Sequence, residues 1–118
     1  MNSIEKLEVA VKAADSKRGE KTVAIDVHEI SLLADYFMVT QADSARQVKA
    51  IVKEIQDQEE LAGVEVRRIE GRNSTSWVLL DFGDLIVHVF KTESREFYDL
   101  EKFWSEGASV DLSAWIEE

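Results

Sequence analysis

The sequence contains no cysteine, which excludes both a disulfide framework and a cysteine-ligated zinc site. It is also short of cations, with 14 Lys and Arg against 24 Asp and Glu, a formal net charge of −10 at pH 7. Such a surface repels naked nucleic acid, because binding it depends on neutralising phosphates with Lys and Arg. The charge therefore favours a basic protein partner and disfavours direct sequence-specific nucleic-acid binding, although solubility alone also explains an acidic surface.

Long hydrophobic runs are missing as well. Residues 1–6 carry no apolar run of signal-peptide length, and no later segment is long and apolar enough to span a bilayer. We therefore expect a cytoplasmic protein with no membrane partner. The chain also has no internal repeat, low-complexity segment or linker, so its 118 residues predict a single domain covering residues 1–118.

Hydrophobic periodicity predicts the element order α-β-β-α-β-β-β-α, a mixed five-stranded sheet with flanking helices in the α/β (α+β) class. The first helix begins near Ile4, and the polar set at residues 41–44 supplies an N-cap candidate for the second. The last helix follows the candidate cap Ser94, and the tail from residue 108 suggests only a weak amphipathic turn or short helix. The expected strands cover residues 22–27, 36–40, 64–69, 76–82 and 85–90.

The stretch at residues 76–90 reads as a β-hairpin around which the chain is organised. Its two apolar runs meet at Gly83-Asp84, and Gly can adopt the positive φ of a tight turn. With this turn, alternation places one wholly apolar face in the core, formed by the pairs Phe82/Leu85, Leu80/Val87 and Val78/Val89. The other face mixes apolar groups with an acid and an imidazole, in the pairs Asp81/Ile86, Leu79/His88 and Trp77/Phe90.

Four acidic residues raise the possibility of catalysis. Asp81 and Asp84, with Asp26 and Asp35, could hold Mg²⁺ in a nucleotidyl- or phosphoryl-transfer enzyme. A structural role is the stronger interpretation, because Asp84 lies at a turn and Asp35 lies in a connection where Asp caps backbone groups. The sequence has no glycine-rich phosphate loop, and its two histidines disfavour a histidine metal site. We therefore expect no enzyme, no metal and no cofactor.

Several motifs occur in an order that is characteristic of one family. They are residues 33–40 (LADYFMVT) with Ser44, Glu70-Gly71, residues 77–84 (WVLLDFGD), residues 87–90 (VHVF), and residues 95–101 (REFYDLE) with Trp104. Together they resemble the ribosomal silencing factor family, also called the Iojap or RsfS family. The resemblance extends from the first helix to about Trp104, and the tail from about residue 107 varies in such proteins.

The resemblance implies a nucleotidyltransferase-like fold that has lost its catalytic equipment. It implies binding to the large ribosomal subunit through ribosomal protein L-fourteen, which blocks association with the small subunit and represses translation under nutrient limitation or in stationary phase. The matching motifs carry the partner-binding candidates, which are Trp77, Asp81, His88, Phe90, Tyr98 and Glu101. The sequence leaves open whether the protein forms a homodimer, and the transferase alternative remains the competing hypothesis.

Overall fold

The computed structural model describes residues 1–32, 34–71, 76–94 and 107–116. The helices and strands whose bounds lie wholly within this part of the chain follow in the order α1-β1-β2-α2-β3-β4-β5-β6. Their bounds are α1 Ser3–Ser16, β1 Glu20–Asp26, β2 Tyr36–Ala42, α2 Ala45–Leu61, β3 Arg68–Glu70, β4 Trp77–Asp81, β5 Leu85–Lys91 and β6 Ala108–Ser109.

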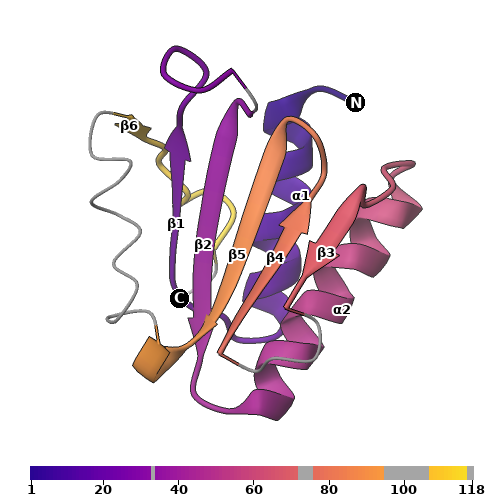
Figure 1. The fold of residues 1–118 in the computed structure, drawn as a ribbon, viewed down its shortest axis with the longest axis vertical. Coiled ribbons are helices and arrows are strands. Elements are labelled where there is room, and N and C mark those ends of the chain that lie inside the picture. Colours follow the sequence, from indigo (N-terminus) through magenta and orange to yellow (C-terminus); the bar gives the residue numbers. More distant parts are fainter. Residues whose placement is uncertain (33, 72–75, 95–106, 117–118) are drawn as a thin grey trace.

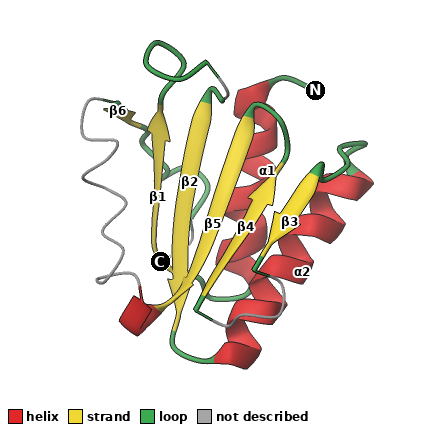
Figure 2. Cartoon of the chain, viewed as in Figure 1, coloured by secondary structure: helices red, strands yellow, loops and turns green. Residues whose placement is uncertain are grey.

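The strands form one mixed sheet in the order β3-β4-β5-β2-β1-β6. The central strands β2 and β5 are parallel, and every other neighbouring pair is antiparallel. Helices α1 and α2 lie together behind one face of this sheet (Figures 1 and 2). The predicted mixed α+β class is therefore confirmed.

The β4–β5 hairpin has the register that alternation predicts. All five pairs that both strands contribute are observed, from Trp77 opposite Phe90 to Asp81 opposite Ile86. The Phe82 amide donates to the Leu85 carbonyl at 2.9 Å, which closes the turn, and Gly83 adopts φ +93°. A positive φ of this size is one that L-residues with a Cβ rarely adopt, so the turn depends on glycine at this position.

The core lies between the helices and the sheet face that they cover. The predicted apolar face of the hairpin is confirmed there, since Val78, Leu80, Phe82, Leu85, Val87 and Val89 are all buried. Leu7 and Val11 of α1, with Val48 and Ile51 of α2, pack into the same cluster. Ser44 caps α2 through a bond from the Gln47 amide, as expected, and Asn2 forms a capping box with Glu5 at the start of α1.

Two strand predictions are wrong. The sheet has six strands instead of five, because Ala108 and Ser109 pair with Asp26 and Ile25 at the β1 edge. A two-residue strand with both side chains exposed has no periodicity to detect. The third strand is Arg68–Glu70 instead of residues 64–69. Val64 belongs to the connection, because its amide donates to the Glu59 carbonyl after α2 and its side chain is buried.

The end of the chain is described in part. Residues 92–94 are already helical, so Ser94 does not precede that helical turn as expected. The rest of the predicted last helix, residues 97–104, lies outside the described residues. In the tail, a turn at residues 113–115 follows the buried Leu112. No helix among the residues described above has the length and hydrophobicity needed to cross a membrane.

Candidate functional site

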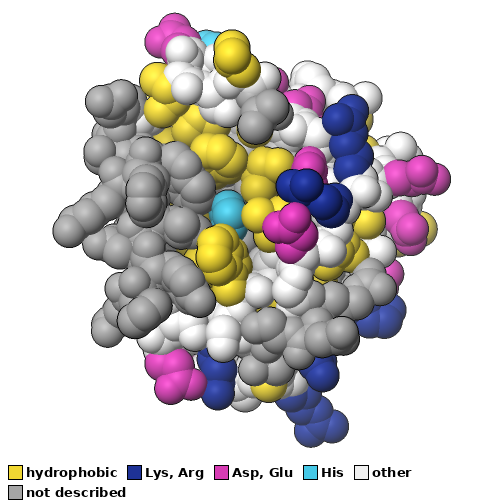
Figure 3. All heavy atoms as spheres, in the orientation of Figure 1, with side chains coloured by type: hydrophobic (Ala, Val, Ile, Leu, Met, Phe, Trp, Pro, Cys, Tyr) yellow, Lys and Arg dark blue, Asp and Glu magenta, His cyan; other side chains and the backbone are white. Residues whose placement is uncertain are grey.

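The sheet face opposite α1 and α2 carries the candidate residues, and we call it the outer face. Strand alternation brings three residues of β4 and three of β5 to it, and the paired strands β2 and β3 add Phe37 and Arg68. Figure 3 views the molecule from this side and shows hydrophobic side chains around a histidine, with charged groups next to them. The members from β4 and β5 are Trp77, Leu79, Asp81, Ile86, His88 and Phe90.

Two aromatic side chains, His88 and Phe90, contact Trp77 on the outer face. Its indole N–H donates to Nδ1 of His88 at 3.0 Å. The indole also stacks on Phe90, with ring centroids 5.3 Å apart and an angle of 20° between the planes. Phe37 meets His88 edge-on, with centroids 6.2 Å apart. A tryptophan whose ring is fixed by both a hydrogen bond and a stack loses little conformational entropy when it binds a partner.

The same hydrogen bond defines the protonation state of His88. Its Nδ1 accepts from an N–H group, so this nitrogen must carry no proton. Burial lowers the pKa of His88 to about 4, because desolvation penalises the imidazolium ion. His88 is therefore neutral at pH 7 and serves as the acceptor that orients Trp77.

Exposure separates the candidate residues into two groups. His88 and Phe90 are only 4% and 1% exposed, whereas Trp77 and Asp81 are partly exposed. Trp77 and Asp81 therefore present surface to solvent, whereas His88 and Phe90 contact the indole while almost fully buried themselves. Tyr98 and Glu101, the remaining two candidates, lie outside the described residues.

Asp81 forms the polar border of the outer face toward β3, four residues along β4 from Trp77. Its Oδ1 accepts from the Gly83 amide at 2.8 Å, and its Oδ2 lies 3.9 Å from Nη2 of Arg68. Nε of Arg68 also lies 3.3 Å from Oε1 of Glu70. The outer face thus ends, toward β3, in a small network of two carboxylates around one guanidinium.

The sequence analysis did not select three partly exposed apolar residues of this face. The hairpin register already placed Leu79 and Ile86 there, so alternation was a sufficient signal for both. Phe37 reaches the face only because β2 pairs in parallel with β5, which sets it beside Ile86. Pairing between strands so distant in sequence has no local signal.

The geometry does not favour the transferase alternative. Asp84 is paired with Lys6 of α1, in the helix layer, whereas Asp81 is held at the outer face by Gly83 and Arg68. The two carboxylates therefore do not converge on one position for a metal ion. Within the described ranges, no group of three or more His, Cys, Asp or Glu side chains is placed to bind one.

His28 lies apart from the aromatic group, at the end of β1. Its Nδ1 contacts Oδ1 of Asp26, and the side chain is largely exposed. The hydrogen bond between the two side chains, together with the attraction of their charges, raises the pKa of His28 and lowers the pKa of Asp26. The Asp26 carboxylate is thus paired with a neighbouring histidine. This pairing disfavours Asp26 as the Mg²⁺ ligand that the transferase alternative requires.

Comparison with known proteins identifies the family. The family model described as ribosomal silencing factor during starvation matches residues 1–118. A ribosomal silencing factor from Bacillus subtilis is 44% identical over 112 residues, which cover 95% of each chain.

Solved structures agree with the sequence comparison. A crystal structure from Chromobacterium violaceum superposes with a TM-score of 0.87 at 34% identity, covering 89% of this chain and 88% of that one. A second, from Bacillus halodurans, has a TM-score of 0.83 at 40% identity, covering 93% of this chain and 100% of that one. The resemblance noted in the motifs is therefore confirmed, and the chain belongs to the ribosomal silencing factor family.

Proposed function

We propose that this protein binds the large ribosomal subunit through ribosomal protein L-fourteen and blocks association with the small subunit. The outer face makes the contact, and the result is repression of translation under nutrient limitation or in stationary phase. The proposed site of action is the cytoplasm. Membership of the ribosomal silencing factor family supports a role on the ribosome.

The observation that carries the proposal is the presentation of Trp77. The indole is partly exposed, yet it is fixed by the His88 hydrogen bond and the Phe90 stack. Tryptophan is among the residues most enriched at energetic hot spots of protein interfaces, where a few side chains supply most of the affinity. The partly exposed apolar residues Phe37, Leu79 and Ile86 would exclude water around such a contact.

Charge supports a basic protein as the partner. The chain carries a net charge of −10, and a surface of that sign accelerates association with a positively charged one. Asp81, at the β3 border of the same face, offers a carboxylate to such a partner. A basic ribosomal protein satisfies both the charge and the apolar contact better than bare RNA does.

The proposed mechanism is steric exclusion and requires no chemistry. A folded body of 13.4 kDa that occupies part of the intersubunit surface of the large subunit displaces a contact of the small subunit. The requirement is affinity sufficient to compete with subunit joining. One or two aromatic contacts worth about 2 kcal/mol each would make a decisive contribution.

Co-sedimentation with purified large subunits tests the proposal, and light scattering measures subunit joining. Trp77→Ala should weaken binding by about thirtyfold, equivalent to about 2 kcal/mol, and should restore subunit joining in proportion. Trp115→Ala is the matched control, because Trp115 is also a partly buried tryptophan that packs against the core but lies in the tail, away from the outer face.

Two results would contradict the proposal. If the wild-type protein stays in the supernatant when large subunits are pelleted, the binding role is wrong. If the protein binds but Trp77→Ala and Trp115→Ala bind equally well, the outer face is not the contact surface. A measurement of the unfolding midpoint for both variants confirms that the comparison concerns folded proteins.

A further inference from the structure

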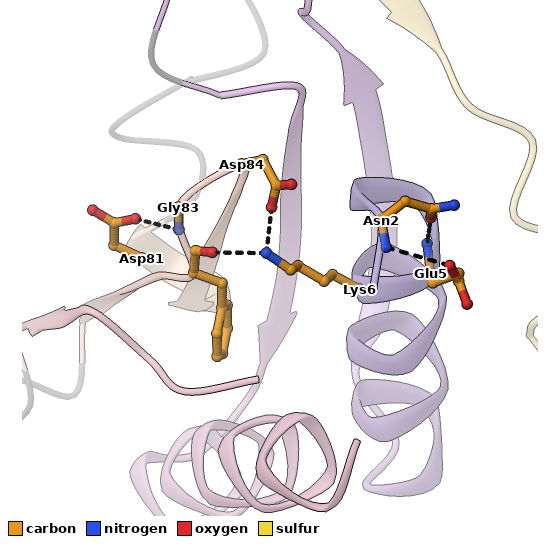
Figure 4. A network of polar contacts seen from close by, with 7 residues as sticks. Asn2, Glu5, Lys6, Asp81, Gly83 and Asp84 are labelled. Atoms are coloured by element: carbon orange, nitrogen blue, oxygen red, sulfur yellow. Dashed lines mark hydrogen bonds and ion pairs between the residues drawn. The ribbon is translucent and has the colours of Figure 1, made fainter. Parts of the chain in front are cut away.

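Lys6 connects the helix layer to the hairpin that carries the outer face. Its ammonium group donates to Oδ1 of Asp84 at 2.8 Å and to the carbonyl of Phe82 at 3.4 Å. Figure 4 shows Lys6 reaching from α1 to the turn between β4 and β5, where Asp84 meets it. The lysine side chain is only 17% exposed, so the pair is better shielded from water than a surface ion pair is.

The turn that Lys6 holds also positions other parts of the protein. The Gly83 amide donates to Oδ1 of Asp81, and this bond fixes the carboxylate at the border of the outer face (Figure 4). The carbonyl of Asp84 accepts from the amides of Asp35 and Tyr36 at the start of β2. A displacement of the turn would therefore move Asp81 and loosen the beginning of a central strand.

A buried acid acts on the same ion pair from α2. Glu59 has 0% exposure, and neither of its carboxyl oxygens has a hydrogen-bond partner. The charged groups that act on it are the ammonium of Lys6, from α1, and the carboxylate of Asp84, from the turn. The strands behind this part of the core contribute apolar side chains. Burial raises the pKa of Glu59 to about 8, so the carboxyl is protonated at pH 7.

Deprotonation of Glu59 would change the electrostatic attraction between Lys6 and Asp84. While the carboxyl is neutral, Lys6 keeps its bonds to Asp84 and to the Phe82 carbonyl. Once ionised, Glu59 competes with Asp84 for the same ammonium group and repels Asp84 directly. A buried carboxylate with no hydrogen bond also favours any movement that admits water. Both effects weaken the attachment of the turn to α1.

We propose that Lys6 is a positioning residue for the outer face, and that the proton on Glu59 keeps Lys6 attached to the β4–β5 turn. This inference rests on the binding role proposed above for the outer face. Neutral conditions hold the turn and Asp81 in place, whereas alkaline conditions release them. Lys6 and Glu59 would not touch the partner, since both act through the turn.

The test uses ¹³C-detected NMR, which does not depend on amide protons that exchange rapidly at high pH. The carboxyl carbons of Glu59 and Asp84 and the carbonyl of Gly83 are followed from pH 6 to about pH 9.5 in the full-length protein. In the wild type, all three signals should titrate together with a midpoint near 8. In Glu59→Gln, the Asp84 and Gly83 signals should stay constant through that range.

Binding to large subunits at neutral pH provides the second measurement. Lys6→Met should bind severalfold more weakly, and its Gly83 signal should differ from that of the wild type already at pH 7. Lys12→Met is the matched control, because Lys12 also lies on α1 but pairs with Glu8 on the same helix. Glu59→Gln should bind as the wild type does.

The outcomes distinguish this inference from the proposed function. The proton-dependent attachment is overturned if the Gly83 and Asp84 signals of the wild type do not change with pH. It is also overturned if these signals titrate in Glu59→Gln as they do in the wild type. Equal binding by Lys6→Met and the wild type overturns the positioning role. If the wild type fails to bind large subunits, the proposed function and the positioning role fail together, but the NMR titration still decides whether Glu59 controls the turn.

Discussion

Two buried titratable groups should give this protein opposing dependences of stability on pH. Burial lowers the pKa of His88 to about 4 from an ordinary value of 6.5, and raises that of Glu59 to about 8 from an ordinary value of 4.5. Where the folded and unfolded states bind different numbers of protons, each pH unit changes the free energy of unfolding by about 1.4 kcal/mol per proton. The signs of the two contributions differ.

For His88, the unfolded state holds the additional proton between about pH 4 and pH 6.5. The contribution of His88 to the free energy of unfolding is therefore fully present above pH 6.5. It decreases by about 3 kcal/mol in all as the pH falls toward 4. Protonation at Nδ1 would also end the hydrogen bond from Trp77. The stability that His88 loses on acidification is thus coupled to the loss of the Trp77 contact.

For Glu59, the folded state holds the additional proton between about pH 4.5 and pH 8. Stability from this residue is highest below pH 4.5 and decreases as the pH rises, by about 3 kcal/mol at pH 7 and somewhat more by pH 8. Between pH 4.5 and pH 6.5 the contributions of Glu59 and His88 largely offset each other. The free energy of unfolding of the wild type should therefore change little with pH in that interval, so neither contribution is visible in it.

Single substitutions should separate the two contributions in urea denaturation measured at intervals from pH 4.5 to 8.5. Relative to the wild type, Glu59→Gln should gain stability steadily as the pH rises, reaching about 3 kcal/mol between pH 4.5 and pH 7. His88→Gln, which keeps an acceptor, should lose its relative stability as the pH rises to 6.5. Glu60→Gln is the control for Glu59, because Glu60 is exposed on the same helix. If the free energy of unfolding of both the Glu59 and His88 variants changes with pH as that of the wild type does, burial does not shift the two pKa values and the reasoning is refuted.

Three further predictions concern packing, backbone conformation and charge. Val87 is fully buried, so Val87→Ala should lower the free energy of unfolding by roughly 1–3 kcal/mol while binding to large subunits is unchanged; an unaltered urea midpoint would contradict this. Gly71 has φ +77°, and an added Cβ would lie 2.2 Å from the Trp77 carbonyl, so Gly71→Ala should cost well over 2 kcal/mol. Gly63→Ala, with φ +88° and open space around it, should cost about 1 kcal/mol, and equal losses would show that the close contact is not the cause. Asp81→Lys should slow association with large subunits in stopped-flow experiments, and the effect should shrink at high salt; a defect independent of salt would argue against a basic partner.

The sequence by itself determined the features that depend on neighbouring residues. Alternation and one glycine specified the hairpin register from Trp77 to Phe90, because side chains of a strand alternate faces and a two-residue turn allows few registers. The apolar spacing of Val48, Ile51, Val52 and Ile55 similarly predicts the inner side of α2, where all but the partly buried Val52 are buried. The ordered motifs identified the family without any knowledge of the structure.

Only the tertiary structure decided what comes together from distant segments. Parallel pairing of β2 with β5 brings Phe37 to His88, and the contact of α1 with the hairpin brings Lys6 to Asp84 across 78 positions of the sequence. Glu59 continues the apolar spacing of α2, but a glutamate near the end of a helix is usually solvent-exposed, so its complete burial was not foreseeable. Local rules specify which face of its own element a side chain occupies, whereas long-range packing decides what that face meets.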